Sequence, residues 1–149
     1  MESSSKNRQA WMRLLALSEW EDFKKVASYF ELITCEVIRK PETGLVMLRG
    51  RMGGTGSAFN IGEATVTRCA VKTHSGTEGH AYVMGRSAEH AKLAAICDAL
   101  MQDESMSEKI ERLVLQPLEE ILTARRDLNS RKAEATKVDF FTLVRGDND

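Results

Sequence analysis

The spacing of apolar side chains changes twice along this chain of 149 residues, and these changes limit its fold more than any other feature. Over residues 7–30 the apolar residues recur every three or four positions, as in an amphipathic helix. Over residues 33–84 the pattern becomes that of strands, and helical spacing returns over residues 88–122. This order of helices, consecutive strands and helices favours an α+β fold over a parallel βαβ fold.

The β region predicts an antiparallel sheet of about four strands, flanked by amino-terminal and carboxy-terminal helices. The strands are expected at residues 35–39, 45–52, 63–73 and 79–84, with turns at 41–44 and 74–77. Helices are expected at residues 7–17 and 19–30 and again from about Ser87 and Ser107, with Pro117 kinking or restarting the last one. A chain of this length usually forms one domain, so we expect a single domain over residues 1–149.

Charge and hydropathy exclude several classes of partner. The formal net charge of -1 gives no long-range basic field of the kind that most nucleic-acid binders use. No apolar run approaches the roughly 20 residues that span a bilayer, and the amino terminus lacks the pattern of a secretory signal. We therefore expect a cytoplasmic protein that binds neither membrane nor nucleic acid.

Neither the cysteines nor the histidines have the spacing of metal ligands. The cysteines Cys35, Cys69 and Cys97 are odd in number and widely separated, which predicts small, mostly buried side chains rather than disulfides or a zinc ribbon. His80 and His90 could meet in space, but a surface or structural role is the commoner one for such histidines. We expect no metal site in this chain.

A glycine-rich stretch follows the second predicted strand and offers a candidate anion site. Gly53, Gly54 and Gly56 can expose backbone amides to an anion, and Arg51 and Arg68 flank them with guanidinium groups that suit phosphate. The stretch lacks the Gly-Lys-Ser/Thr ending of a Walker A loop. A turn or bulge between strands explains the same glycines and is the preferred interpretation.

Arg86 is a further anion-binding candidate, because it lies at the start of the helix predicted from Ser87. A helix amino terminus and an arginine can hold a phosphate together. The alternative is an ordinary surface ion pair between Arg86 and a carboxylate such as Glu89.

The carboxy-terminal segment offers candidates for docking on a partner. The charged span 125–137 is expected to continue helically, either reaching across a partner or lying solvated. Phe140 and Phe141, in a predicted strand or extended tail over residues 138–144, either fill the chain's own core or dock on another subunit. Arg145 is a candidate for anion binding or docking in the same tail, which could also be flexible.

No complete catalytic set is recognisable in the sequence. There is no serine-elbow motif, no cysteine with a catalytic partner, no paired-histidine motif and no cysteine cluster for an iron–sulfur centre. We therefore leave the catalytic residues of this chain unassigned.

Five segments, taken in order, carry a resemblance to PhnG, a subunit of the bacterial carbon–phosphorus lyase system. They are Arg51–Gly56, Gly62–Arg68, Gly85–Arg86, Asp98–Gln102 and Val138–Asp147. The resemblance implies a role in phosphonate catabolism, within a core complex with PhnH, PhnI and PhnJ that also works with PhnL. It implies that the complex uses ATP and an alkylphosphonate as substrates and releases adenine, and that this chain itself carries no cofactor.

The same resemblance implies how the chemistry is divided among the subunits. The product expected of the complex is an α-D-ribose 1-alkylphosphonate 5-triphosphate, with the nucleosidase-like activity on PhnI and the later radical cleavage on PhnJ. This chain would then be either a contributor to a shared anionic site or a scaffold that touches no substrate.

Overall fold

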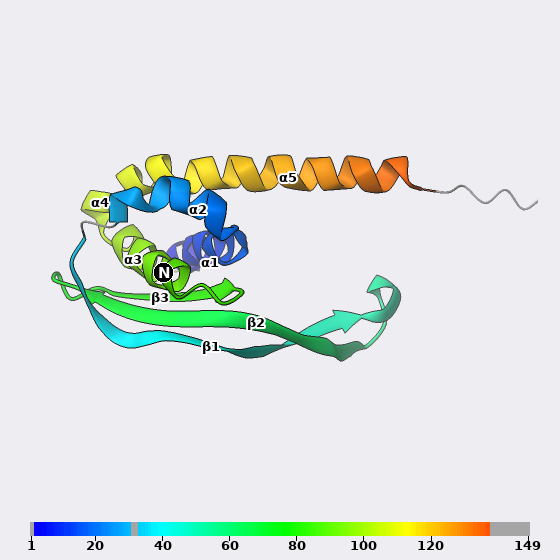
Figure 1. Ribbon diagram of the computed structural model, residues 1–149, viewed down its shortest axis with the longest axis horizontal. Coiled ribbons are helices and arrows are strands. Elements are labelled where there is room, and N and C mark those ends of the chain that lie inside the picture. Colours follow the sequence, from blue (N-terminus) through cyan, green and yellow to red (C-terminus); the bar gives the residue numbers. More distant parts are fainter. Residues whose placement is uncertain (1, 31–32, 138–149) are drawn as a thin grey trace, which may run out of the picture.

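The computed structural model describes residues 2–30 and 33–137, which form a three-stranded antiparallel sheet with helices packed on one face (Figure 1). The strands are β1 (Cys35–Arg51), β2 (Ala58–Thr73) and β3 (Glu78–Met84), in the order β1-β2-β3. The helices are α1 (Glu2–Leu17), α2 (Trp20–Ala27), α3 (Ala88–Met101), α4 (Glu104–Ile110) and α5 (Gln116–Ala135). The structure confirms the predicted α+β class and the antiparallel sheet.

The sheet has three strands where the sequence predicted about four. Residues 41–44, predicted as a turn, lie inside β1, which pairs with β2 from Cys35 to Arg51. The register shifts between Arg39 and Glu42, so that Lys40 and Pro41 stand opposite one residue of β2. The predicted turn was wrong because β1 is an edge strand, where a bulge accommodates a proline without reversing the chain.

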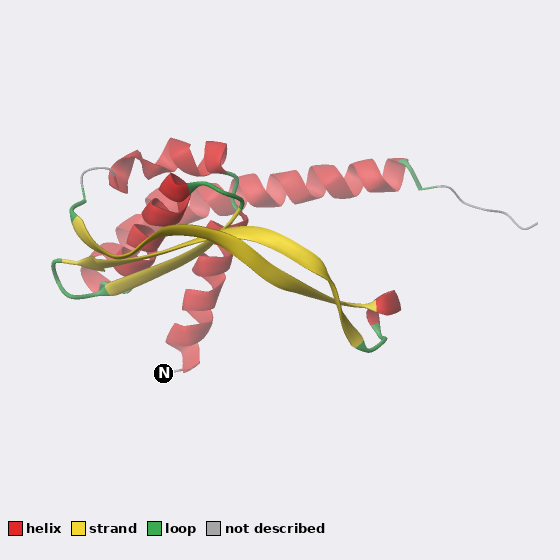
Figure 2. Cartoon of the chain, turned by 60° about the horizontal axis from the view of Figure 1, so that its bottom comes forward, coloured by secondary structure: helices red, strands yellow, loops and turns green. Residues whose placement is uncertain are grey.

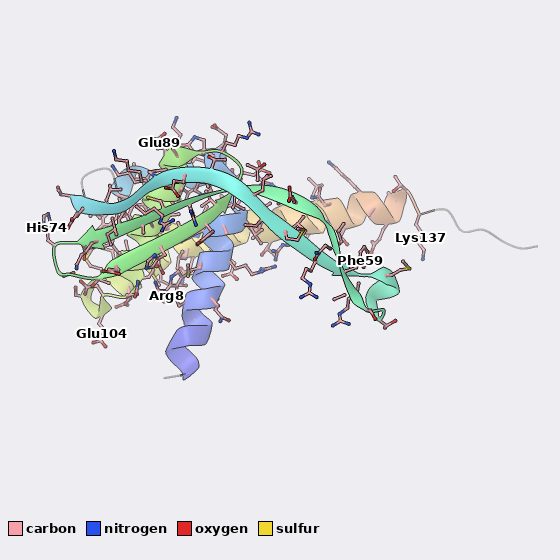
Figure 3. All side chains as sticks on the ribbon, turned by 90° about the horizontal axis from the view of Figure 1, so that it is seen from below. Arg8, Phe59, His74, Glu89, Glu104 and Lys137 are labelled. Atoms are coloured by element: carbon pink, nitrogen blue, oxygen red, sulfur yellow. The ribbon has the colours of Figure 1, made fainter. Side chains whose placement is uncertain are left out.

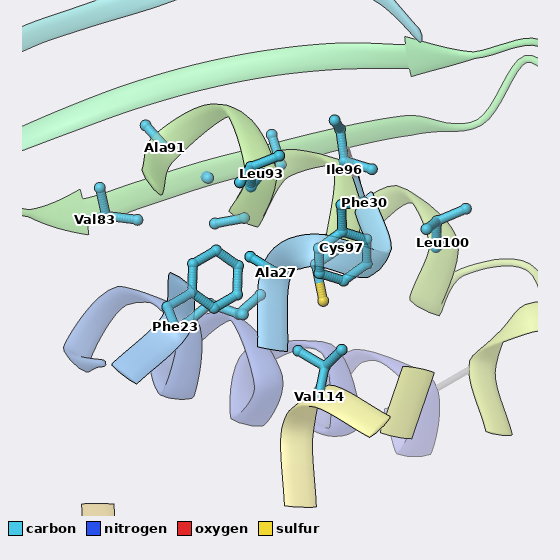
Figure 4. Close-up of a cluster of buried hydrophobic side chains, with 14 of the residues drawn as sticks. Phe23, Ala27, Phe30, Val83, Ala91, Leu93, Ile96, Cys97, Leu100 and Val114 are labelled. Atoms are coloured by element: carbon cyan, nitrogen blue, oxygen red, sulfur yellow. The ribbon is translucent and has the colours of Figure 1, made fainter. Parts of the chain in front are cut away.

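The core lies between the sheet and α3, which is the central helix of the layer (Figure 4). The short alanine side chains of α3 let the helix lie close to the sheet, and Gly79 of β3 lies directly beneath the helix. A Cβ at position 79 would overlap the Ala95 carbonyl and Ala99, so this close approach of helix and strand requires a glycine. Phe23 and Phe30 close the core from the side of α2.

A buried carboxylate fixes the position of α1 against this core. Asp98 of α3 is fully buried and accepts hydrogen bonds from Arg8 Nε at 3.1 Å and Arg8 Nη2 at 2.7 Å. It also accepts from Trp11 Nε1 at 3.0 Å and from the backbone amide of His80 at 2.9 Å. A buried charge is tolerated only when it is paired and hydrogen-bonded, and Asp98 thereby joins α1, α3 and β3.

The chain from α4 to α5 is helical throughout, with one wide turn of π-helix, η3 (Glu111–Leu115), between them. Pro117 lies in the first turn of α5, directly after the π-helical turn, so the kink or restart predicted at this proline coincides with a change of helix type inside a continuous helical stretch. The charged span predicted to continue helically does so to Ala135. Residues 138–144, the predicted terminal strand or tail, lie outside the described residues.

Of the residues of α5, only Leu118 is buried. Arg125 holds the helix against α2 through ion pairs with Asp22 and, at 2.6 Å, with Glu19. Beyond Arg125 the helix extends past the other helices (Figure 1). Its distal half therefore has a fixed direction but little packing within the chain.

Candidate partner-binding surface

The β1–β2 hairpin continues well beyond the third strand and forms a projecting arm. Pairing with β3 begins only at Val66, so residues 45–64 form two strands joined by the glycine loop, and no other strand among residues 2–30 and 33–137 lies beside them. We call this segment the distal arm. Figures 1 and 2 show it reaching past α1, α2, α3 and α4, in the same direction as α5.

The distal arm exposes large apolar side chains on both of its faces. Leu45 and Met47 lie on the face of the hairpin that the helices cover where all three strands pair, and their exposed fractions are 64% and 55%. On the opposite face lie Leu48, Ile61 and Phe59, the last of which is labelled in Figure 3. Alternation along the strands places Leu45 beside Met47 on the first face, where their cross-strand partners are Thr65 and Glu63, and gathers the other three on the second face.

Such an arm is poorly suited to standing alone in water. An isolated two-stranded hairpin is marginally stable, and clustered apolar surface of this kind marks a site of protein interaction. Within the described ranges no strand pairs with the outer edge of β1, which is the arrangement that natural sheets normally protect. The arm is therefore the strongest candidate for a partner-binding surface in the described part of the chain.

The predicted anion-binding loop lies at the tip of this arm. Arg51 Nη1 donates to the Gly56 carbonyl at 3.0 Å, and the Gly56 amide donates to the Met52 carbonyl at 3.0 Å, which closes the loop on itself. Gly53 and Gly54 adopt φ angles of 60° and 80°. The loop thus brings Arg51 and the three glycines together, and it serves as the hairpin turn between β1 and β2.

Arg68 lies elsewhere, on the outer face of β2. It donates from Nε at 3.2 Å and from Nη2 at 3.0 Å to Glu42 Oε2 on β1, and this carboxylate raises the pKa of Arg68. Ala58 pairs with Arg51, and Arg68 is ten residues farther along β2, or roughly 33 Å at the usual strand rise. Arg51 and Arg68 of one chain therefore do not meet around one small anion.

Arg86 occupies a third place, exposed in the connection between β3 and α3. Ser87 caps α3 by accepting a hydrogen bond from the His90 amide at 3.1 Å, as the sequence predicted. Among residues 2–30 and 33–137 the structure contains no ion pair between Arg86 and Glu89. The docking candidates Phe140, Phe141 and Arg145 lie outside the described residues.

The histidines and cysteines have the structural environments that the sequence favoured. Cys69 and Cys97 are buried and Cys35 is partly buried. His90 is buried against Phe23, with a ring-centroid distance of 4.8 Å, and desolvation lowers its pKa to about 4. Within the described ranges no group of three or more His, Cys, Asp or Glu side chains is placed to hold a metal ion.

Sequence reasoning missed two features of this surface and its support. Asp98 could have been noticed, because a carboxylate within an alanine-rich apolar stripe requires buried partners. The exposure of the distal arm could not have been predicted, because Leu48 and Phe59 belong to strands in which apolar and polar residues alternate as they do in any core strand. Only the position of the helices shows which part of the hairpin they leave uncovered.

The fold and its surface define a class of protein: an α+β domain whose helices cover only half of a long β-hairpin. None of the helices in the described part combines the length and apolar character needed to cross a bilayer. Residues 6–146 match the family model described as "Phosphonate metabolism protein PhnG". The chain belongs to this PhnG family.

A relative from Rhizobium meliloti (strain 1021) is similar over most of its length. It is named alpha-D-ribose 1-methylphosphonate 5-triphosphate synthase subunit PhnG. The two sequences are 48% identical over 115 residues, which cover 74% of this chain and 70% of the relative.

Proposed function

We propose that this chain is a subunit of a multi-subunit synthase that acts in phosphonate catabolism. In the proposed reaction an alkylphosphonate is transferred to the ribose C1 of ATP, adenine leaves, and the product is a ribose 1-alkylphosphonate 5-triphosphate. Membership of the PhnG family and the name of the 48% identical relative support this proposal. The proposed partners are PhnH, PhnI, PhnJ and PhnL, and the proposed compartment is the cytoplasm.

The single observation that carries a subunit role is the distal arm. A chain that exposes Leu45, Met47 and Phe59 on an unsupported hairpin gains stability when a partner covers them. We propose that the partner subunits pack on both faces of this arm and supply the catalytic residues. The chain binds no cofactor of its own in this proposal.

A contribution to a shared anionic site is the second candidate role. The glycine loop and Arg51 lie together at the tip of the arm, where a partner's active site could receive them. Arg68 and Arg86 would serve separate contacts, because they lie on the sheet and at the start of α3. The carboxy-terminal candidates Phe140, Phe141 and Arg145 would add a docking segment.

The test is co-expression of this chain with the proposed partners, followed by purification of the complex and an assay of adenine release. Phe59→Asp together with Ile61→Asp should abolish co-purification and adenine release, because two carboxylates would be buried in the interface. Ile38→Asp, on β1 beside the core and 51% exposed, is the matched control and should leave both unchanged. Full assembly of the arm variant would contradict the proposed role of the arm.

The same assay separates the two candidate roles. If the loop contributes to an anionic site, Arg51→Ala should reduce adenine release at least tenfold while the complex still assembles, as expected when a charged hydrogen bond to substrate is lost. If both Arg51→Ala and Arg68→Ala kept full activity, the anionic-site role would be ruled out and the scaffold role would remain.

A further inference from the structure

The distal half of α5 carries a cationic surface that is not covered by residues 2–30 or 33–137. Residues 125–137 hold five basic side chains against two acidic ones, and every described residue from 126 to 137 is exposed. A helix gains most of its stability from packing against other elements, which this half of α5 lacks. Arg125, through its ion pairs with α2, fixes the direction in which the exposed half extends.

A groove of about 850 Å³ lies beside the first turns of α5, at the opposite end of this helix from the exposed half. One wall is a stripe of α1 that includes Trp11 and Leu14, and the other runs from α4 through the π-helical turn into α5. Its apolar residues include Leu115. The second wall spans Glu108 to Glu119, about 17 Å at the helical rise, so the groove is long enough for roughly three turns of a further helix.

The groove is acidic as well as apolar. Glu108, Glu111 and Glu119 line it, and none of its described lining residues is basic. Within residues 2–30 and 33–137 these three carboxylates form no ion pair. A helix with basic side chains would therefore complement the charge of the groove as well as its shape.

Two segments of the chain could be considered as occupants of the groove, and only one of them has the required positive charge. The last twelve residues, 138–149, hold three aspartates and one arginine, so their charge is of the wrong sign. The distal half of α5 has the right sign and is already helical. It cannot reach its own groove, because it leads away from the groove along the same helix (Figure 1).

We propose that the acidic groove of one copy receives the cationic distal half of α5 from a second copy. The two α5 helices would then run antiparallel, with Glu119 of each copy facing the basic half of the other. Each copy offers one groove and one helix, so the same contact forms twice and closes a symmetric pair. This proposal goes beyond the synthase role and does not depend on phosphonate chemistry.

The test is the mass of the purified chain in solution, measured by sedimentation equilibrium over a range of concentration and salt. The chain should form a dimer that dissociates as ionic strength rises, because salt screens exposed charges. Glu108→Lys with Glu119→Lys should give a monomer, and so should Arg126→Glu with Arg131→Glu. An equimolar mixture of the two monomeric variants should restore a dimer.

The control is Glu36→Lys with Glu89→Lys, which makes the same change of net charge at exposed positions outside the groove. It should remain dimeric. Circular dichroism of every variant checks that it is folded. A monomeric parent chain, or charge-reversed variants that stay dimeric, would overturn the proposal, and neither result would affect the test of the arm against partner subunits.

Discussion

Among single residues, Asp98 has the environment that can least tolerate substitution. Its carboxylate is fully buried and receives donors from three side chains, Arg8, Trp11 and Gln102, and from one backbone amide. Asp98→Ala should lower the free energy of unfolding by about 3 to 5 kcal/mol, because Arg8 and the His80 amide lose a buried charged partner. Urea denaturation measures this loss.

The matched control for Asp98 is Asp103, an aspartate that caps α4 from the surface through the Ser105 amide. Asp103→Ala should lower the free energy of unfolding by only about 1 kcal/mol, the usual cost of losing a helix cap. Equal losses for the two substitutions would show that the carboxylate cluster does not fix α1 in the way described.

His90 makes the stability of the chain depend on pH. Its folded pKa of about 4 lies below the usual value of 6.5, because the buried ring is desolvated. Above pH 6.5 the ring is neutral in both states, so it has no effect there. As the pH falls from 6.5 to 4, the unfolded chain binds a proton that the folded chain does not, and stability decreases by up to roughly 3 kcal/mol.

His90→Gln removes this titration and should flatten that part of the stability curve, whereas His80→Gln, at an exposed position, should leave it intact. The measurement is the urea midpoint at a series of pH values between 4 and 7. The prediction fails if His90→Gln retains the same pH dependence as the parent chain.

At the scale of elements, the two halves of the β1–β2 hairpin should differ in local stability. Residues 66–72 of β2 lie between two strands and beneath α3, whereas residues 45–64 have neither a third strand nor helix cover from the described part of the chain. Amide hydrogens of the distal arm should therefore exchange faster in the isolated chain and become protected in the assembled complex. Hydrogen exchange followed by mass spectrometry tests this, and equal protection in the isolated chain would contradict it.

The elements show what local pattern can and cannot predict. The alternation of apolar residues located β3 and residues 63–73 of β2, and the cap at Ser87 located the start of α3. Pro41 misled the prediction, because its effect depends on whether the strand is central or at an edge. That position is decided by pairing with β2, which is not encoded in the five residues around Pro41.

For the whole molecule, the sequence was sufficient for the fold class but not for the surfaces. The distal arm and the acidic groove both arise from where the helix layer ends relative to the sheet. Glu108 and Trp11 are 97 positions apart in the chain, and no periodicity relates them. The candidate anion residues were likewise dispersed by the fold to the arm tip, the middle of the sheet and the start of α3.

The exposed arm has a consequence for the life of the chain in a cell. A copy that finds no partner displays apolar strands of the kind that chaperones hold and proteases cleave, so surplus copies would be removed while assembled ones persist. The hairpin would then act as a quality signal, matching the amount of this chain to that of the proteins that cover it.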